Sequence, residues 1–89
     1  MYTVYVLRSH RGLRYIGHTS NLDQRLREHN SGTCKTTKVD TGWVVVYQET
    51  FGSRSEAMKR EKWLKSGAGR EFLRAREATS IDLSRQKDQ

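Results

Sequence analysis

The 89-residue sequence has no proline and a single cysteine, Cys34. Without proline, the turns must be formed by glycine, asparagine and serine. One cysteine cannot form a disulfide within the chain, so the hydrophobic core has to stabilise the fold without a covalent cross-link. A reducing compartment fits this cysteine content, and we therefore expect the protein in the cytoplasm.

Long hydrophobic runs are also missing. No apolar stretch approaches the roughly 18 residues of a membrane span. The first seven residues have the pattern of a strand and lack the charged-then-apolar layout of a secretion signal. Only 34% of the residues are hydrophobic, so the chain predicts one domain with a thin core, near the lower size limit for independent folding. We expect no membrane partner.

Acidic residues are scarce beside basic ones. Ten Asp and Glu stand against 17 Lys and Arg, which gives a net charge of +7 and a pI near 10.0. Such an excess favours a polyanionic partner, above all nucleic acid. The alternative is that the excess charge only keeps a small protein in solution.

The pattern of hydrophobic residues predicts a small α/β (α+β) domain. Residues 2–7 and 13–17 are rich in aromatic and β-branched side chains and predict two strands of an antiparallel hairpin. A valine-rich run at 43–47 predicts a third strand, which we expect at the centre of the sheet. The expected fold is a three-stranded, mostly antiparallel sheet flanked by helices.

Two serines mark the expected helix starts. Ser20 and Ser53 each precede an acidic residue by three positions, as in a capping box. The first helix should end near Gly32 in a left-handed conformation. The second should run through Lys65 and be broken by the glycines that follow it.

A shorter helix is expected at 70–76, packing Phe72 and Leu73 onto the core. Trp63 is expected to pack against this helix, and the alternative is that its ring stacks on an unpaired base. Residues 78–89 are polar and predict a disordered tail, so the domain should span 1–77.

The first helix places two polar side chains next to its apolar face. Arg25 and His29 lie one turn apart beside two leucines, at the expected rim of the packed surface. The guanidinium of Arg25 fits a phosphodiester, or it pairs with Asp23 or Glu28 on the helix surface. His29 suits proton exchange near neutral pH or a hydrogen bond to a tyrosine, or it is a favourable cation at a helix C-terminus.

On the second helix, Glu61 interrupts the apolar stripe formed by Ala57 and Leu64. A carboxylate in that place is costly unless it is paired or binds a metal ion. One alternative is a structural ion pair with Arg25 or a lysine. The other is a site for Mg²⁺ or Mn²⁺, because these ions retain waters and accept phosphate oxygens from a substrate.

Other polar residues are weaker candidates. Tyr5 and Tyr15 can share one side of the hairpin, depending on its register, although a strand tyrosine by itself is ordinarily a packing residue. The spacing of His10, His18 and Cys34 matches no zinc-finger pattern, so we set a zinc site aside. Candidates for contacts to the nucleic-acid backbone are Arg14, Arg27, Lys35, Lys38, Lys62 and Lys65.

Four segments follow one another in a characteristic order: Thr3-Val4-Tyr5, Tyr15-Ile16-Gly17, Asn21-Leu22-x-x-Arg25-Leu26-x-x-His29-Asn30 and Glu56-Ala57-x-x-x-Glu61-Lys62-x-Leu64-Lys65. Over about Tyr2 to Leu73, this set resembles the GIY-YIG nuclease family. The likeness is greatest to its small stand-alone branch and to the catalytic domain of the Slx-type structure-selective endonucleases. Thr3 replaces the family's glycine, and His18 stands where the repair-nuclease branch typically has lysine.

The resemblance implies roles for five residues. Glu61 aligns with the family's metal-binding glutamate, and Arg25 would stabilise the phosphoryl transition state. Tyr5 would be the general base, Tyr15 a positioning hydroxyl and His29 an orienting group. The implied activity is a Mg²⁺- or Mn²⁺-dependent endonuclease acting on DNA, with RNA left open, in repair or recombination.

Two other functions stay open at this point. One is a nucleic-acid-binding accessory module with little or no turnover, and the other is a protein-interaction adaptor that uses the polar tail. Because the chain has no room for a further DNA-binding module, a protein partner could supply specificity. The sequence leaves open which DNA structure is cut, whether the chain acts alone, and its oligomeric state.

Overall fold

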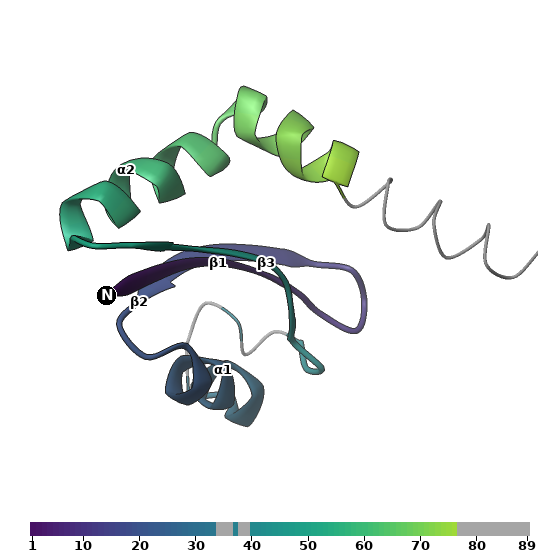
Figure 1. Ribbon diagram of the computed structural model, residues 1–89. Coiled ribbons are helices and arrows are strands. Elements are labelled where there is room, and N and C mark those ends of the chain that lie inside the picture. The colour runs from purple at the N-terminus through teal and green to yellow at the C-terminus, as the bar shows by residue number, and fades with distance from the viewer. Residues whose placement is uncertain (34–36, 38–39, 77–89) are drawn as a thin grey trace, which may run out of the picture.

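The computed structural model describes residues 1–33, 37 and 40–76. Five elements follow one another along the chain: β1 (Tyr2–Arg8), β2 (Arg14–Thr19), α1 (Leu22–Ser31), β3 (Val44–Phe51) and α2 (Arg54–Leu64). A further helical segment at 67–76 comes after α2. The three strands form one antiparallel sheet with helices on both sides (Figure 1). The predicted α+β class is confirmed.

The strand order in the sheet is β2-β1-β3. The central strand is therefore β1, and the prediction that the third strand lies at the centre is wrong. Residues 4–7 of β1 are all buried, whereas burial along β3 alternates with exposure, as expected for an edge strand with one covered face. A valine-rich run predicts a strand, but its place in the sheet depends on pairing with distant residues.

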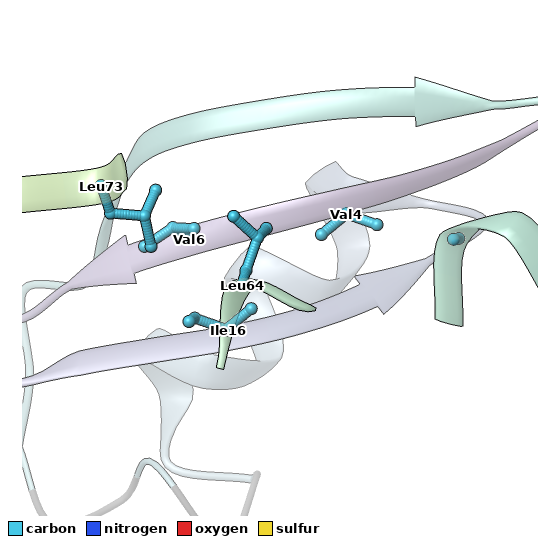
Figure 2. Close-up of a cluster of buried hydrophobic side chains, with 6 residues drawn as sticks. Val4, Val6, Ile16, Leu64 and Leu73 are labelled. Carbon is cyan, nitrogen blue, oxygen red and sulfur yellow. The ribbon is translucent and has the colours of Figure 1, made fainter. Parts of the chain in front are cut away.

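Two separate cores lie on the two faces of the sheet. Alternation along β1 directs Val4 and Val6 towards α2 and the 67–76 segment, where Leu64 and Leu73 complete the packing (Figure 2). Tyr5 and Leu7 point to the other face of the sheet, where they belong to the second core together with two leucines of α1. The helices α1 and α2 thus cover opposite faces of one thin sheet (Figure 1).

The start of α1 differs from the prediction by one residue. Asn21, rather than Ser20, is the N-cap, and its Oδ1 accepts a hydrogen bond from the Gln24 amide at 3.2 Å. Asparagine and serine cap helices about equally well, so two adjacent candidates are not separable by residue type. The other two expected helix ends are confirmed: Gly32 closes α1 with φ of 82°, and Ser53 caps α2.

The connection after α2 also differs from the prediction. The chain leaves the helix at Lys65 and Ser66, and Gly67 and Gly69 lie inside the helical segment 67–76 instead of breaking a helix. Gly69 is buried, and a Cβ there would lie 2.2 Å from the Trp63 carbonyl oxygen. This glycine therefore allows the 67–76 segment to approach the end of α2 closely.

The packing expected for the last helix is confirmed. Trp63 contacts Phe72 edge to face, with ring centroids 5.7 Å apart, and Leu73 is buried in the core on that side of the sheet. The domain boundary at 77 and the expected tail at 78–89 lie outside the described residues, as do Lys35 and Lys38. No described helix is long and apolar enough to cross a membrane.

Candidate active site

Three aromatic rings meet on the α1 face of the sheet. The hairpin register pairs Tyr5 with Gly17 and Leu7 with Tyr15, which places both phenols on the same face. The Tyr5 and Tyr15 ring centroids are 6.1 Å apart, and the Tyr15 and His29 centroids are 4.8 Å apart. The sequence left the relation between the two tyrosines dependent on register, and this register brings them together.

Gly17 is required by this arrangement. A Cβ at position 17 would lie 2.9 Å from Tyr5 Oη and 2.9 Å from Tyr15 Cε2. Both distances are well below the roughly 3.5–4.0 Å of an ordinary contact between carbon atoms. The glycine of the second tripeptide therefore leaves room for both tyrosine rings, a function that could not be derived from the sequence pattern.

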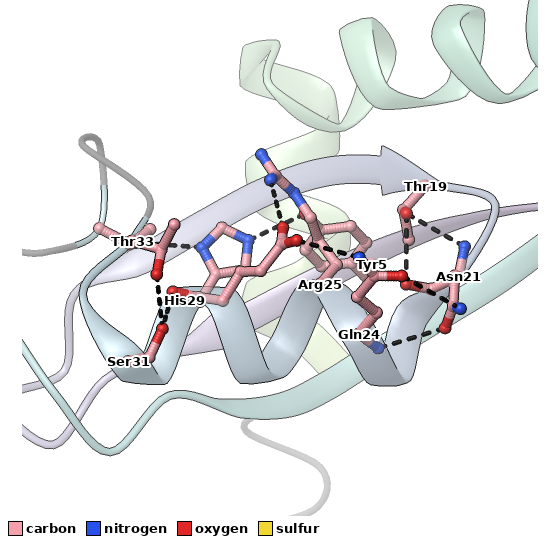
Figure 3. Close-up of polar contacts among 10 residues, drawn as sticks. Tyr5, Thr19, Asn21, Gln24, Arg25, His29, Ser31 and Thr33 are labelled. Atoms are coloured by element: carbon pink, nitrogen blue, oxygen red, sulfur yellow. Dashed lines mark hydrogen bonds and ion pairs between the residues drawn. The ribbon is translucent and has the colours of Figure 1, made fainter.

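His29 lies deeper than the predicted rim position. It is fully buried, and its Nε2 lies 3.0 Å from Tyr5 Oη (Figure 3). Its Nδ1 lies 2.7 Å from Thr37 Oγ1. Burial, with a smaller effect of the nearby Arg25, lowers the pKa of His29. A neutral imidazole has one donor and one acceptor, so the ring donates one of these bonds and accepts the other. Burial and the lowered pKa do not favour the alternative of a cation at the helix C-terminus.

The two tyrosines differ in their access to the surface. Tyr5 is only 1% exposed, whereas Tyr15 is half-buried and lines an open cavity of about 570 Å³. We call this hollow the edge cavity, since it lies against edge strand β2; its lining is Arg14, Tyr15, Ile16, Lys65 and Arg70. Of the two phenols, Tyr15 is therefore the better placed to meet a substrate.

Arg25 lies on α1, on the same face of the sheet as the tyrosines. Its Nη1 donates to Glu28 Oε1 at 2.8 Å, so the helix-surface ion pair considered for this residue is present. The hydrogen bond from Arg25 lowers the pKa of the Glu28 carboxyl. Because the side chains of both partners are about one-third exposed, solvent screens the pair and it contributes little to stability. An incoming phosphate could therefore compete for this guanidinium.

Glu61 lies on the other face of the sheet, on α2. Its Oε1 is 2.5 Å from His18 Nδ1, and its Oε2 is 2.7 Å from Lys65 Nζ. Burial alone would raise the pKa of Glu61, but the hydrogen bonds from His18 and Lys65 lower it below the ordinary value. An ionised carboxylate only accepts hydrogen bonds, so Nδ1 of His18 carries a proton. The expected lysine pair is present, and His18 is a partner that sequence reasoning missed.

A smaller hollow of about 260 Å³ surrounds this carboxylate. We call it the carboxylate cavity; its lining is His18, Met58, Glu61, Lys62 and Lys65. Lys65 also lines the edge cavity, so its side chain belongs to the lining of both hollows. The structure thus gathers Tyr5, Tyr15 and His29 in one cluster and places Glu61 on the opposite side of the sheet.

The donor set around Glu61 fits one kind of metal ion. Within residues 1–33, 37 and 40–76, no three His, Cys, Asp or Glu side chains are grouped closely enough to hold an ion by themselves. Mg²⁺ and Mn²⁺ need only one or two carboxylates when waters and substrate phosphates complete their shell. Lys65, whose side chain is 53% exposed, is the group that such an ion would displace from Oε2.

The predicted backbone-binding residues divide into two groups. Arg14 and Lys65 line the edge cavity, and Lys62 lines the carboxylate cavity. Arg27 is exposed on α1 and lines none of the cavities described here. Arg70 lines the edge cavity and was missed, because no pattern in the sequence links the last helix to strand β2.

Comparison with known proteins defines the class. The family model of the GIY-YIG catalytic domain matches residues 1–74. The chain belongs to the GIY-YIG family, a nuclease family whose members generally depend on a divalent metal. The matched range includes both tyrosines, Gly17, Arg25 and Glu61.

Within this family, the similar proteins are small UPF0213 proteins. One from Staphylococcus haemolyticus is 39% identical over 72 residues, covering 80% of this chain and 88% of the relative. Another, from Halobacterium salinarum, is 39% identical over 66 residues, covering 73% of this chain and 86% of its own. The solution NMR structure of a UPF0213 protein from Bacillus halodurans is 33% identical and superposes with a TM-score of 0.52, covering 84% of each chain.

Proposed function

We propose that the protein is a Mg²⁺- or Mn²⁺-dependent endonuclease that hydrolyses phosphodiester bonds in DNA at the edge of strand β2. The observation that carries this proposal is that Lys65 lines two cavities. One of them is also lined by Glu61 and the other by Tyr15. Hydrolysis of a phosphodiester needs a cation that stabilises the charged phosphate and a group that contacts the attacking water. Glu61 would hold the cation, and Tyr15 would provide the contact.

Glu61 would hold the metal ion through Oε2, while His18 keeps Oε1 in place. When bound, Mg²⁺ or Mn²⁺ would polarise the phosphate and neutralise charge on the leaving oxygen. Lys65, once displaced from Glu61, is long enough to turn its ammonium towards a phosphate in either cavity. Arg25 would exchange its weak pair with Glu28 for a phosphoryl oxygen, for which its planar donors are suited.

The two tyrosines would divide the work differently from the expectation based on family resemblance. That expectation makes Tyr5 the general base, yet Tyr5 is buried and hydrogen-bonded to His29. We assign the contact with the attacking water to Tyr15, which lines the edge cavity. Tyr5 and His29 then act as positioning residues, because their rings pack against the ring of Tyr15.

The test is cleavage of labelled flap, junction and single-stranded DNA with Mg²⁺, with Mn²⁺ and with EDTA. Glu61→Gln should abolish metal-dependent cleavage on every substrate while circular dichroism shows an unchanged fold. Glu71→Gln is the matched control, because Glu71 is an exposed carboxylate paired with Arg74 and lines neither cavity. Wild-type rates in Glu61→Gln would refute the proposal.

The second candidate function is a nucleic-acid-binding module without turnover, and one feature of the same carboxylate favours it. Both Glu61 oxygens already have partners, in His18 and Lys65, which is also what a binding module without turnover would show. That function predicts salt-sensitive DNA affinity that added Mg²⁺ does not change, and no cleavage on any of the three substrates. A role in repair or recombination, with a protein partner supplying specificity, would follow from a preference for flaps or junctions.

A further inference from the structure

A third shallow cavity, of about 430 Å³, lies along the outer side of α2. We call it the helix cavity; its lining is Arg54, Ser55, Met58, Lys59 and Lys62. It shares Met58 and Lys62 with the carboxylate cavity, which in turn shares Lys65 with the edge cavity. The three hollows therefore form a series from the start of α2 to edge strand β2, in which neighbouring hollows share lining residues.

We propose that this series of hollows, here called the α2 track, binds the sugar-phosphate backbone of one DNA strand and leads it across Glu61 to Tyr15. The proposal rests on the proposed function in taking DNA as the substrate. It adds a binding site in which Arg54, Lys59 and Arg70 join three residues already expected to contact DNA.

The charge of the track supports this occupant. Six cations line it, and Glu61 is the only anion among the lining residues of the three cavities; the cations are Arg14, Arg54, Lys59, Lys62, Lys65 and Arg70. Phosphate would be attracted along the whole track except at Glu61. A metal ion at that carboxylate would reverse the local charge and draw the strand in at the proposed site of cleavage.

The length of the track matches a short stretch of backbone. From Arg54 to Lys65 the helix advances by 11 residues, or about 16 Å at roughly 1.5 Å per residue. One strand of B-form DNA presents a phosphate about every 3.4 Å along the helix axis, so the helical part of the track spans about five phosphates. Met58, which is 51% exposed between the cations, offers an apolar contact for a deoxyribose.

Arg54 is not needed to stabilise α2. Arg54 occupies the first turn, where the helix dipole disfavours a positive charge. By contrast, Arg60 on the same helix donates two hydrogen bonds to Glu49, at 2.9 and 3.0 Å, and its guanidinium lies over the Trp63 ring. Arg60 therefore has a structural role, which separates it from Arg54 and Lys59.

The experiment compares two double variants, each of which removes two positive charges. Arg54→Gln with Lys59→Gln changes only the helix cavity. Arg11→Gln with Arg74→Gln is the matched control, because both arginines are exposed and neither lines the track. Affinity for a single strand and for a duplex of equal length is measured in EDTA between 50 and 200 mM salt, so turnover is not required.

We expect the track variant to bind DNA more weakly. Its slope of log affinity against log salt should be shallower than that of wild type, by about 1.8 on duplex or about 1.4 on a single strand. The substrate showing the loss identifies the form of DNA that the track holds. The control should keep the wild-type slope. Equal losses in both double variants, or a wild-type slope in the track variant, would overturn the proposal.

The two proposals can fail separately. If Glu61→Gln keeps wild-type cleavage, the proposed catalytic site is wrong, while the salt slopes still decide the track. If wild type cleaves DNA and the two double variants have equal slopes, the track alone is wrong. Circular dichroism melting of both double variants verifies that lost affinity does not reflect lost folding.

Discussion

Replacing Gly17 by alanine should disrupt the aromatic cluster of the proposed site while leaving its charged residues intact. The added methyl group would lie 2.9 Å from both Tyr5 Oη and Tyr15 Cε2, and 3.1 Å from Tyr5 Cζ. Relief of these contacts requires both rings to move by about 0.5–1 Å, since ordinary carbon contacts begin at about 3.5 Å. Such a shift would stretch or break the 3.0 Å hydrogen bond between Tyr5 and His29.

The expected cost is that of overpacking a small core, about 1–3 kcal/mol. For a domain of this size, a loss of 1 kcal/mol lowers Tm by about 4–8 °C. Thermal melting by circular dichroism should therefore show a decrease of at least about 4 °C. Cleavage should decrease as well, because Tyr15 would no longer lie where the edge cavity presents it.

A double variant makes the reasoning specific. Tyr5→Phe removes the Oη atom that the new methyl group meets, so Gly17→Ala should cost less in a Tyr5→Phe background than in wild type. Gly52→Ala is the control, because a Cβ at Gly52 meets no atom within 4 Å. Equal Tm values for Gly17→Ala and Gly52→Ala would refute the steric account, as would full additivity in the double variant.

Three further predictions concern buried groups. The lowered pKa of His29 means that the unfolded chain takes up its proton first. This contribution to stability should therefore be complete above about pH 6.5 and be lost as the pH falls towards the folded-state pKa, which Tm measurements from about pH 7.5 to 5 would show. Gly69→Ala should destabilise by more than 1 kcal/mol because its Cβ would overlap the Trp63 carbonyl oxygen, whereas Gly67→Ala should be neutral or stabilising by up to about 1 kcal/mol. Tyr5→Phe should mainly lower stability, by about 1–3 kcal/mol, whereas Tyr15→Phe should mainly lower the cleavage rate.

Each of these predictions has a result that would contradict it. A His29→Gln variant should lose part of the acid sensitivity, and an unchanged pH profile would show that other groups cause it. Equal effects of the two glycine substitutions on Tm would contradict the close approach of the 67–76 segment to α2. A Tyr5→Phe variant that cleaves more slowly than Tyr15→Phe would restore the assignment of Tyr5 as general base.

Local sequence patterns predicted much of the fold. The β-branched and aromatic runs correctly placed the hairpin, and Gly32 and Ser53 marked helix ends because caps depend on residues a few positions apart. The position of β3 at an edge was not predictable in this way, since it depends on which strand pairs with which. Gly69 was mistaken for a helix breaker because its function depends on the distance between two helices.

The site was predicted less completely than the fold. The periodicity of α1 correctly placed His29 beside the apolar face. It did not show that the side chain is fully buried, because that depends on its contact with the Tyr5 hydroxyl of a distant strand. The pattern of α2 showed that Glu61 needed a partner, yet His18 lies 43 positions away and has no local signal. Alternation along β2 explains both results, because His18 and Ile16 face α2 while Tyr15 and Gly17 face α1.

The most direct test of the central claim measures Mg²⁺-dependent cleavage rates in four proteins: wild type, Tyr15→Phe, Glu61→Gln and the double variant. If the phenol and the carboxylate act on one phosphodiester across the edge of β2, their losses should be strongly non-additive. The account predicts a double variant that is no slower than the slower single variant. Fully additive losses, or a wild-type rate in either single variant, would contradict a shared site.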